Sequence, residues 1–206
     1  MDEVKKILQY KEKIERGGKE VRSIAEEIHQ QASSEEACKK LAFDLFAHEK
    51  PAIKMVAVFL FGILASRTNN ALSFLHGKVS QEQDWRVQEI LAQAFDRYCS
   101  DIGYESALPT IKAWLADNNA NVRRAASEGL RIWTSRPFFK DHPEIALQLL
   151  SALKDDESEY VRKSAGNALR DISRKHKTLV ANEVQAWDTS DKRVLFTYKL
   201  ASKFLE

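Results

Sequence analysis

Apolar residues recur at helical spacing along nearly the whole chain, and one helical pattern is written several times. Residues 121–133 read NVRRAASEGLRIW and residues 160–172 read YVRKSAGNALRDI, with Val122 and Val161 39 residues apart. A third copy covers residues 86–98 (RVQEILAQAFDRY), and a fainter one covers residues 52–62 (AIKMVAVFLFG). Each interval has room for a second helix, so the pattern predicts stacked helix pairs.

The repeat length and the helix-rich composition together predict the fold class. We expect an all-α protein, a HEAT-like helical-repeat solenoid (an α-α superhelix) with a concave basic face. Strand-like alternation and low-complexity linkers are absent from the sequence, so one domain spanning residues 1–206 is expected. In such a stack the repeated inner helices line one wall, and function is sought there.

Capping residues and prolines divide the chain into individual helices. Ser33 and Ser34 predict a cap for the helix that follows them, and Pro51 fits a first helical turn. Pro109 predicts a bent or delayed start, and residues 136–139 (RPFF) interrupt the repeat. The helices are expected over residues 4–17, 21–31, 35–48, 51–62, 70–78, 84–98, 104–116, 121–133, 143–153, 161–175, 179–187 and 192–205.

Alignment of the repeated helices separates a buried stripe from a variable one. Apolar or small residues occupy the first stripe at every copy: Val87, Val122, Val161, Leu91, Ala126, Ala165, Phe95, Leu130 and Leu169. The second stripe changes from copy to copy: Trp85, Glu89 and Gln93, then Arg124, Glu128 and Arg131, then Lys163, Asn167 and Arg170 or Asp171. Shared packing with unshared inner residues predicts a single asymmetric site built across the repeats.

Charge is concentrated in the repeated helices, although the whole chain carries only +2. Residues 121–140 hold five Lys or Arg against one acid, and residues 159–178 hold six against two. A local basic stripe on a near-neutral protein is typical of a polyanion site, although solvated helix faces give the same count. Cys38 and Cys99 provide no disulfide framework, and the N-terminal residues lack a signal-peptide pattern, so a cytoplasmic location is expected.

At these residues the chain resembles the HEAT-like-repeat DNA alkylation-repair glycosylases, the AlkC/AlkD superfamily. The resemblance covers residues 51–176 and is strongest in VRRAASEGLR and VRKSAGNALRDISRKH. It implies excision of cationic N3- or N7-alkylated bases from double-stranded DNA by a monomeric enzyme that uses no metal or other cofactor. The D-type pattern matches Trp85, Glu89 and Arg124, with Asn167 where a second Trp is expected. Glu128 and Asp171 fall on the acidic positions of the C-type branch.

The resemblance implies a role for each candidate site residue. Glu89 and Asp171 are the candidate catalytic carboxylates, which would stabilise an oxocarbenium-like sugar and orient water. Trp85 would hold the cationic nucleotide by its ring face. The remaining candidates would contact DNA, chiefly at phosphates: Arg123, Arg124, Glu128, Arg131, Arg162, Lys163, Asn167 and Arg170.

Two other classes of function fit the same sequence. The first is a DNA-binding HEAT protein without catalysis, recognising damaged or branched DNA, and Asn167 in place of a tryptophan favours it. The second is a protein-interaction scaffold, which needs neither the basic stripe nor the Trp85–Glu89 pair. Glu89 and Asp171 could each serve only as the partner of a nearby arginine in an ion pair, which would explain these carboxylates without catalysis. Trp114, Trp133 and Trp187 are expected to pack in the core. The five histidines show no metal-ligand spacing.

Overall fold

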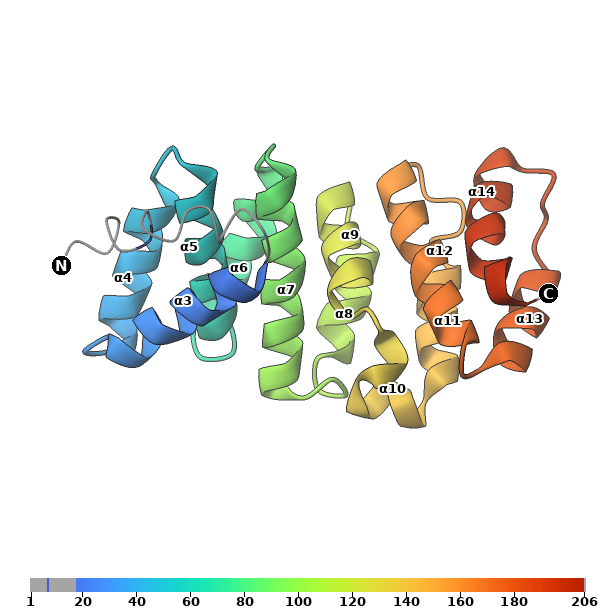
Figure 1. The fold of residues 1–206 in the computed structure, drawn as a ribbon, viewed down its shortest axis with the longest axis horizontal. Coiled ribbons are helices and arrows are strands. Elements are labelled where there is room, and N and C mark those ends of the chain that lie inside the picture. Colours follow the sequence, from blue (N-terminus) through green and yellow to red (C-terminus); the bar gives the residue numbers. More distant parts are fainter. Residues whose placement is uncertain (1–6, 8–17, 206) are drawn as a thin grey trace. The chain divides into compact units, whose positions relative to one another are not determined.

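Helices build the described structure, a computed structural model that describes residue 7 and residues 18–205 (Figure 1). Within those residues there are twelve α-helices and no strand, so the predicted all-α class is confirmed. The chain divides into two compact units, Met1–Ile102 and Gly103–Glu206. A single domain over residues 1–206 stays a prediction, and the helix expected over residues 4–17 lies outside the described residues apart from Ile7, which is helical and buried.

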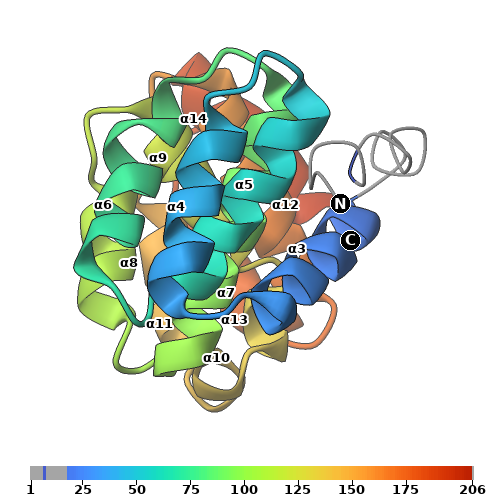
Figure 2. The same cartoon turned by 90° about the vertical axis from the view of Figure 1, so that its left-hand side faces the viewer.

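The first unit packs its helices around one apolar helix, α5. Its elements are α3 (Gly18–Gln31), α4 (Glu35–Phe46), α5 (Pro51–Leu64), α6 (Asn69–Gly77), the short 3₁₀ helix η1 (Val79–Gln81) and α7 (Trp85–Ile102). Helix α4 runs alongside α5, and α3 crosses α5 obliquely (Figures 1 and 2). Twelve residues of α5 are buried, and this explains why its sequence is apolar around its full circumference.

Two local predictions for this unit are confirmed. The Ser34 side chain accepts a hydrogen bond of 3.1 Å from the amide of Ala37 and so caps α4. Pro51 is the first residue of α5, where a missing N–H leaves no helical bond unmade.

The second unit contains three successive helix pairs, with an insertion between the first pair and the second. Its α-helices are α8 (Leu108–Leu115), α9 (Ala120–Gly129), α10 (Pro137–Asp141), α11 (Pro143–Ser151), α12 (Glu159–Ser173), α13 (Lys177–Gln185) and α14 (Lys192–Ala201), with 3₁₀ helices η2 (Trp133–Ser135) and η3 (Ser202–Phe204). Helix α12 packs against α9 on one side and α14 on the other (Figure 1). The predicted buried stripe is confirmed, because all nine of its side chains are 0% exposed.

The predicted helix over residues 121–133 is too long, because α9 ends at Gly129. Side chains from the segment after α9 donate hydrogen bonds to backbone carbonyls of its last turn. The Trp133 indole N–H donates to the carbonyl of Ser127 at 3.0 Å, and Arg136 lies 3.5 Å from the carbonyl of Gly129. Burial of the Trp133 ring therefore ends the helix at a point where apolar spacing alone would continue it.

Candidate nucleic-acid interface

Helices α9 and α12 approach closely in the second unit because small residues line their contact. Ala125, Ala126 and Ser127 of α9 are buried, as are Ser164 and Ala165 of α12. The hydroxyls of Ser127 and Ser164 lie 3.0 Å apart in a hydrogen bond between the two helices. This contact fixes the register in which the longer side chains of both helices reach the surface.

An open pocket of about 310 Å³ lies at that surface. The size is at the lower end of the range for ligand sites in proteins. Its lining combines three cations, one carboxylate, an amide, a hydroxyl and an aromatic ring: Arg124, Arg131, Lys163, Glu128, Asn167, Ser164 and Tyr160. Five of these seven are residues that the sequence predicted to contact DNA. With three cations against one carboxylate in its lining, the pocket suits an anionic ligand.

The pocket carboxylate, Glu128, is held by hydrogen bonds from both sides. Its Oε2 accepts from the Ser164 hydroxyl at 2.8 Å, and its Oε1 accepts from Arg131 Nη1 at 2.9 Å. Charge-assisted bonds of this length are among the stronger ones in proteins. Glu128 thus presents its negative charge in a fixed orientation at the pocket wall.

Arg131 links this carboxylate to a second one outside the pocket. Its Nε lies 2.9 Å from Asp171 Oδ2, while Nη1 contacts Glu128. Burial lowers the pKa of the Arg131 guanidinium and the two carboxylates raise it, with a net upward shift. The group of two carboxylates and one guanidinium carries a net single negative charge.

Asp171 lies deeper than the sequence suggested for a catalytic residue. Its side chain is 10% exposed, it does not line the pocket, and Arg170 Nη2 lies 3.4 Å from its Oδ1. The structure thus gives Asp171 the ion-pair contacts that the sequence left as its structural explanation. A direct catalytic part for Asp171 stays a prediction.

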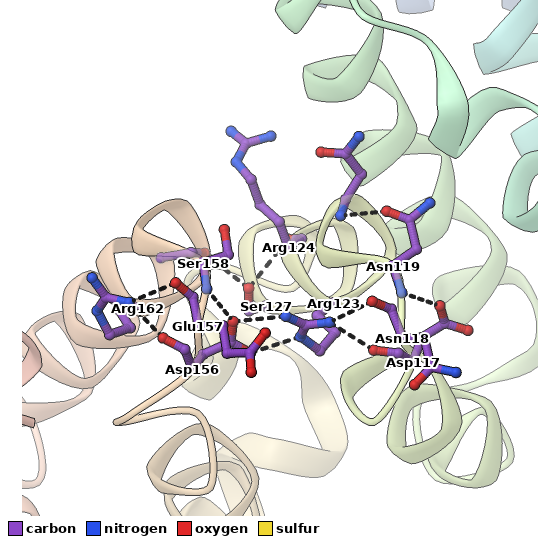
Figure 3. A network of polar contacts seen from close by, with 12 residues as sticks. Asp117, Asn118, Asn119, Arg123, Arg124, Ser127, Asp156, Glu157, Ser158 and Arg162 are labelled. Carbon is purple, nitrogen blue, oxygen red and sulfur yellow. Dashed lines mark hydrogen bonds and ion pairs between the residues drawn. The ribbon is translucent and has the colours of Figure 1, made fainter. Parts of the chain in front are cut away.

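Two candidate DNA contacts, Arg123 and Arg162, have matching structural contacts (Figure 3). Arg123 Nη1 donates to the carbonyls of Asp117 and Asn118, at the turn before its own helix. Arg162 Nη1 donates in the same way to the carbonyls of Asp156 and Glu157. We call this repeated arrangement the arginine clamp. Contact with DNA stays a prediction for both residues.

The clamp of Arg123 also joins two neighbouring helix pairs (Figure 3). Its Nε and Nη2 pair with the two carboxylate oxygens of Asp156 at 2.6 and 2.7 Å. The Asp156 carboxylate is 6% exposed and the Arg123 side chain 14% exposed. The hydrogen bonds that Arg123 donates to Asp156 raise the Arg123 pKa and burial lowers it, and the net shift is upward.

Trp85 and Glu89 lie in the first unit, in the first two turns of α7. Asp84 precedes this helix and accepts bonds from the backbone N–H and the guanidinium of Arg86, at 2.9 and 2.7 Å. These bonds lower the pKa of the Asp84 carboxyl. Trp85 is 71% exposed, so its ring is not a core residue. Its part in ligand binding and the catalytic part of Glu89 stay predictions.

The three other tryptophans behave as the sequence predicted. Trp114, Trp133 and Trp187 are 4%, 0% and 8% exposed, so their assignment to packing is confirmed. Within residues 18–205 the acidic, histidine and cysteine side chains form no cluster suited to a metal ion. Nor does any helix in that range have the length and apolarity needed to cross a bilayer.

The sequence prediction missed two pocket residues, Tyr160 and Ser164. Ser164 faces the helix contact and is buried, and a small residue at such a position indicates only packing. Tyr160 is 74% exposed and precedes the buried Val161, whereas the matching position of α9 carries Asn121. An exposed aromatic ring beside a basic stripe is the signal that would have found it.

Comparisons with known proteins identify the family of this chain and the structures that share its fold. A family model described as "DNA alkylation repair enzyme" matches residues 18–201. The chain belongs to that family of DNA alkylation repair enzymes. An 87-residue stretch, 40% of the chain, is 41% identical to the uncharacterized protein YhaZ of Bacillus subtilis (strain 168), and the match spans 24% of that relative's length.

Solved structures share the fold over most of the chain. AlkD2 from Streptococcus mutans is 45% identical, with a TM-score of 0.90 over 97% of this chain and 99% of that one. The structure of smu.31 from Streptococcus mutans UA159 is 43% identical, with a TM-score of 0.91 over all of both chains. The alkylpurine DNA glycosylase AlkC of Pseudomonas fluorescens, bound to DNA containing an abasic site analog, is 21% identical. Its TM-score is 0.69 over 90% of this chain and 52% of that one, which shows a common fold.

Proposed function

We propose that the protein is a monofunctional DNA glycosylase that excises cationic N3- or N7-alkylated bases from duplex DNA. The observation that carries this proposal is the pocket between α9 and α12, in which one oriented carboxylate stands among three cations. Membership in the DNA alkylation repair enzyme family supports it. The DNA bound to AlkC contains an abasic site analog, and an abasic site is what such a reaction would leave behind.

The proposed chemistry needs little beyond charge and position. An alkylated purine that already carries positive charge leaves without protonation, and the sugar becomes oxocarbenium-like as the glycosidic bond breaks. A fixed carboxylate stabilises that positive charge and orients the attacking water. Glu128 meets the geometric requirement in the second unit, because it lines the pocket and is held by Ser164 and Arg131.

Asp171 would then act through Arg131. Its carboxylate holds the guanidinium that in turn holds Glu128, which makes Asp171 a positioning residue. Glu89 remains the candidate carboxylate of the first unit, on the same helix as Trp85. A cation held over the Trp85 ring would gain about 0.5–2 kcal/mol.

Base release from methylated duplex DNA at low salt tests the proposal. Wild-type protein is expected to release free alkylated base, and Glu128→Gln to lower the rate by about 100-fold or more while DNA binding persists. Asp171→Asn is expected to lower it less, and Glu89→Gln reports whether the first unit supplies a catalytic group. Absence of base release by the wild type would end the glycosylase proposal.

One observation favours a second function, binding of DNA without catalysis. Arg131 lies within 2.9 Å of both Glu128 and Asp171, so a guanidinium already pairs with the two carboxylates that would otherwise stabilise a charged sugar. Under this alternative no carboxylate substitution changes any chemistry. DNA affinity would depend instead on the cations of the pocket.

Salt dependence distinguishes specific phosphate contacts from general basicity. Lys163 is exposed and lines the pocket, whereas Lys112 is exposed on the outer helix α8. Lys163→Ala is expected to weaken DNA binding and to reduce the slope of log K against log salt by about 1, as loss of one phosphate contact does. Lys112→Ala should leave the slope unchanged. Equal slopes for all three proteins would contradict a phosphate contact at Lys163.

A further inference from the structure

Tyr160 is an aromatic side chain placed at a charged pocket and turned toward solvent. It is 74% exposed, although burial of a tyrosine ring normally stabilises the folded protein. The other tyrosines of the second unit are more enclosed, with Tyr104 7% exposed and Tyr198 of intermediate exposure. Tyr160 therefore contributes little to packing and remains available to a ligand.

The surroundings of Tyr160 specify the chemistry of that ligand. Lys163 follows three residues later on α12, and residues at this spacing lie on the same face of a helix. Arg124 of α9 lines the same pocket. Lys163, within the described part of the chain, forms no ion pair. A flat ring beside two cationic side chains suits a ligand with a flat apolar face and a phosphate.

The copies of the repeated helix show that the ring is particular to this position. Asn121 occupies the corresponding place in α9 and Arg86 in α7, so stacking of the repeats does not require an aromatic residue there. The adjacent position, by contrast, is valine in all three copies and is fully buried in each. The ring is thus a feature of the pocket rather than of the fold.

We propose that Tyr160, Lys163 and Arg124 form a binding site for one unstacked nucleotide of DNA. The tyrosine ring stacks on the base, and the two cations hold its phosphate. This inference rests on the proposed function in taking DNA as the ligand, and it adds a preference for DNA in which one nucleotide is unpaired. Aromatic stacking accepts any base, since every base has a π face.

Binding of two labelled duplexes by fluorescence anisotropy tests the proposal. One duplex carries a single extrahelical thymidine, and the other has the same sequence without it. Tyr160→Leu is expected to weaken binding of the bulged duplex by about 5- to 150-fold, the loss that removal of one stacking ring produces. The intact duplex should change by less than about twofold on that scale, and Tyr160→Phe should bind both duplexes as the wild type does.

Phe204→Leu is the matched control, because Phe204 is an exposed ring of the same unit that does not line the pocket. It should bind both duplexes as the wild type does. Equal affinities of wild type and Tyr160→Leu for the bulged duplex would overturn the proposal. A parallel loss on both duplexes would also overturn it, as would a loss in Tyr160→Phe, which would indicate a hydroxyl contact. Base release measured on the same preparations reports separately on the glycosylase proposal, because the anisotropy readout does not need turnover.

Discussion

The hydroxyl of Ser164 donates a hydrogen bond of 2.8 Å to Oε2 of Glu128, although the two residues belong to different helices. Ser164 is 3% exposed, whereas the Glu128 side chain is 25% exposed. A buried group at the helix contact therefore orients a charged group at the pocket. This one hydrogen bond therefore contributes both to the packing of α9 against α12 and to the orientation of the carboxylate in the pocket.

Ser164→Ala tests how much that bond stabilises the fold. We expect the free energy of unfolding to fall by about 1 kcal/mol, because a hydrogen bond to a charged group is lost but water can still reach Oε2. Urea denaturation followed by circular dichroism measures the change. Ser100→Ala, on an exposed position of α7, is the control and should be neutral. An unchanged stability in Ser164→Ala would mean that the bond is replaced by water without loss.

The buried pair of Arg123 and Asp156 is expected to stabilise the protein more than an exposed pair. Arg123→Ala should lower the free energy of unfolding by about 2–4 kcal/mol, because it leaves the Asp156 carboxylate buried without its cation. Arg67→Ala, which removes a pair with Glu35 whose partners are 43% and 50% exposed, should lower it by about 0–1 kcal/mol. Equal losses in the two variants would contradict a special role for the clamp.

Two glycines with opposite surroundings predict opposite effects of alanine. A Cβ at Gly62 would lie 2.7 Å from Ala94 Cα, whereas a Cβ at Gly77 would meet no atom within 4 Å. Gly62→Ala should destabilise by about 1–3 kcal/mol, since the backbone of α7 must move. Gly77→Ala should be neutral or stabilise by up to about 1 kcal/mol, because alanine restricts the unfolded chain. Thermal denaturation of both variants decides the comparison, and destabilisation by Gly77→Ala alone would reverse it.

His29 predicts a dependence of stability on pH. Burial and the nearby Arg67 guanidinium lower the pKa of His29 below its ordinary value of 6.5. The unfolded chain therefore binds the proton more readily than the folded protein, and stability contributed by neutral His29 is lost as the pH falls below about 6.5.

The variant His29→Gln isolates this contribution. Between about pH 7.5 and pH 5.5, a range that brackets the ordinary histidine pKa, the wild type should lose more stability than the variant. Urea midpoints measured at both pH values provide the test, and His142→Gln, at a site whose side chain is 50% exposed, is the control. Identical slopes for wild type and His29→Gln would contradict the lowered pKa.

The positions and order of the helices could be predicted from the sequence because the spacing of apolar residues directly reflects which side chains are buried. The nine residues of the shared stripe are buried as expected, and Pro51 and Ser34 begin their helices where capping rules place them. The end of α9 did not follow, since it depends on where the Trp133 ring and the Arg136 guanidinium reach after a change of chain direction. Side-chain reach across a turn has no signature in periodicity.

The site was predicted in part for a similar reason. Residue type and helical register identified Arg124, Glu128 and Lys163 as neighbours on one surface, and the pocket contains all three. Register alone could not separate a guanidinium at the surface from one folded back onto the backbone. Arg123 and Arg124 are adjacent and chemically identical, yet the first binds carbonyls of the preceding turn.

The arginine clamp has a consequence for how a chain of this kind can be lengthened during evolution. Arg123 and Arg162 both donate to main-chain oxygens, which every amino acid supplies, so these particular bonds do not depend on the side chains of the preceding turn. A duplicated segment that contains a helix pair and the turn before its inner helix would therefore carry both the arginine and the main-chain oxygens to which it donates. Gene duplication could thus lengthen the protein one pair at a time, while the residues facing the ligand diverged independently in each copy.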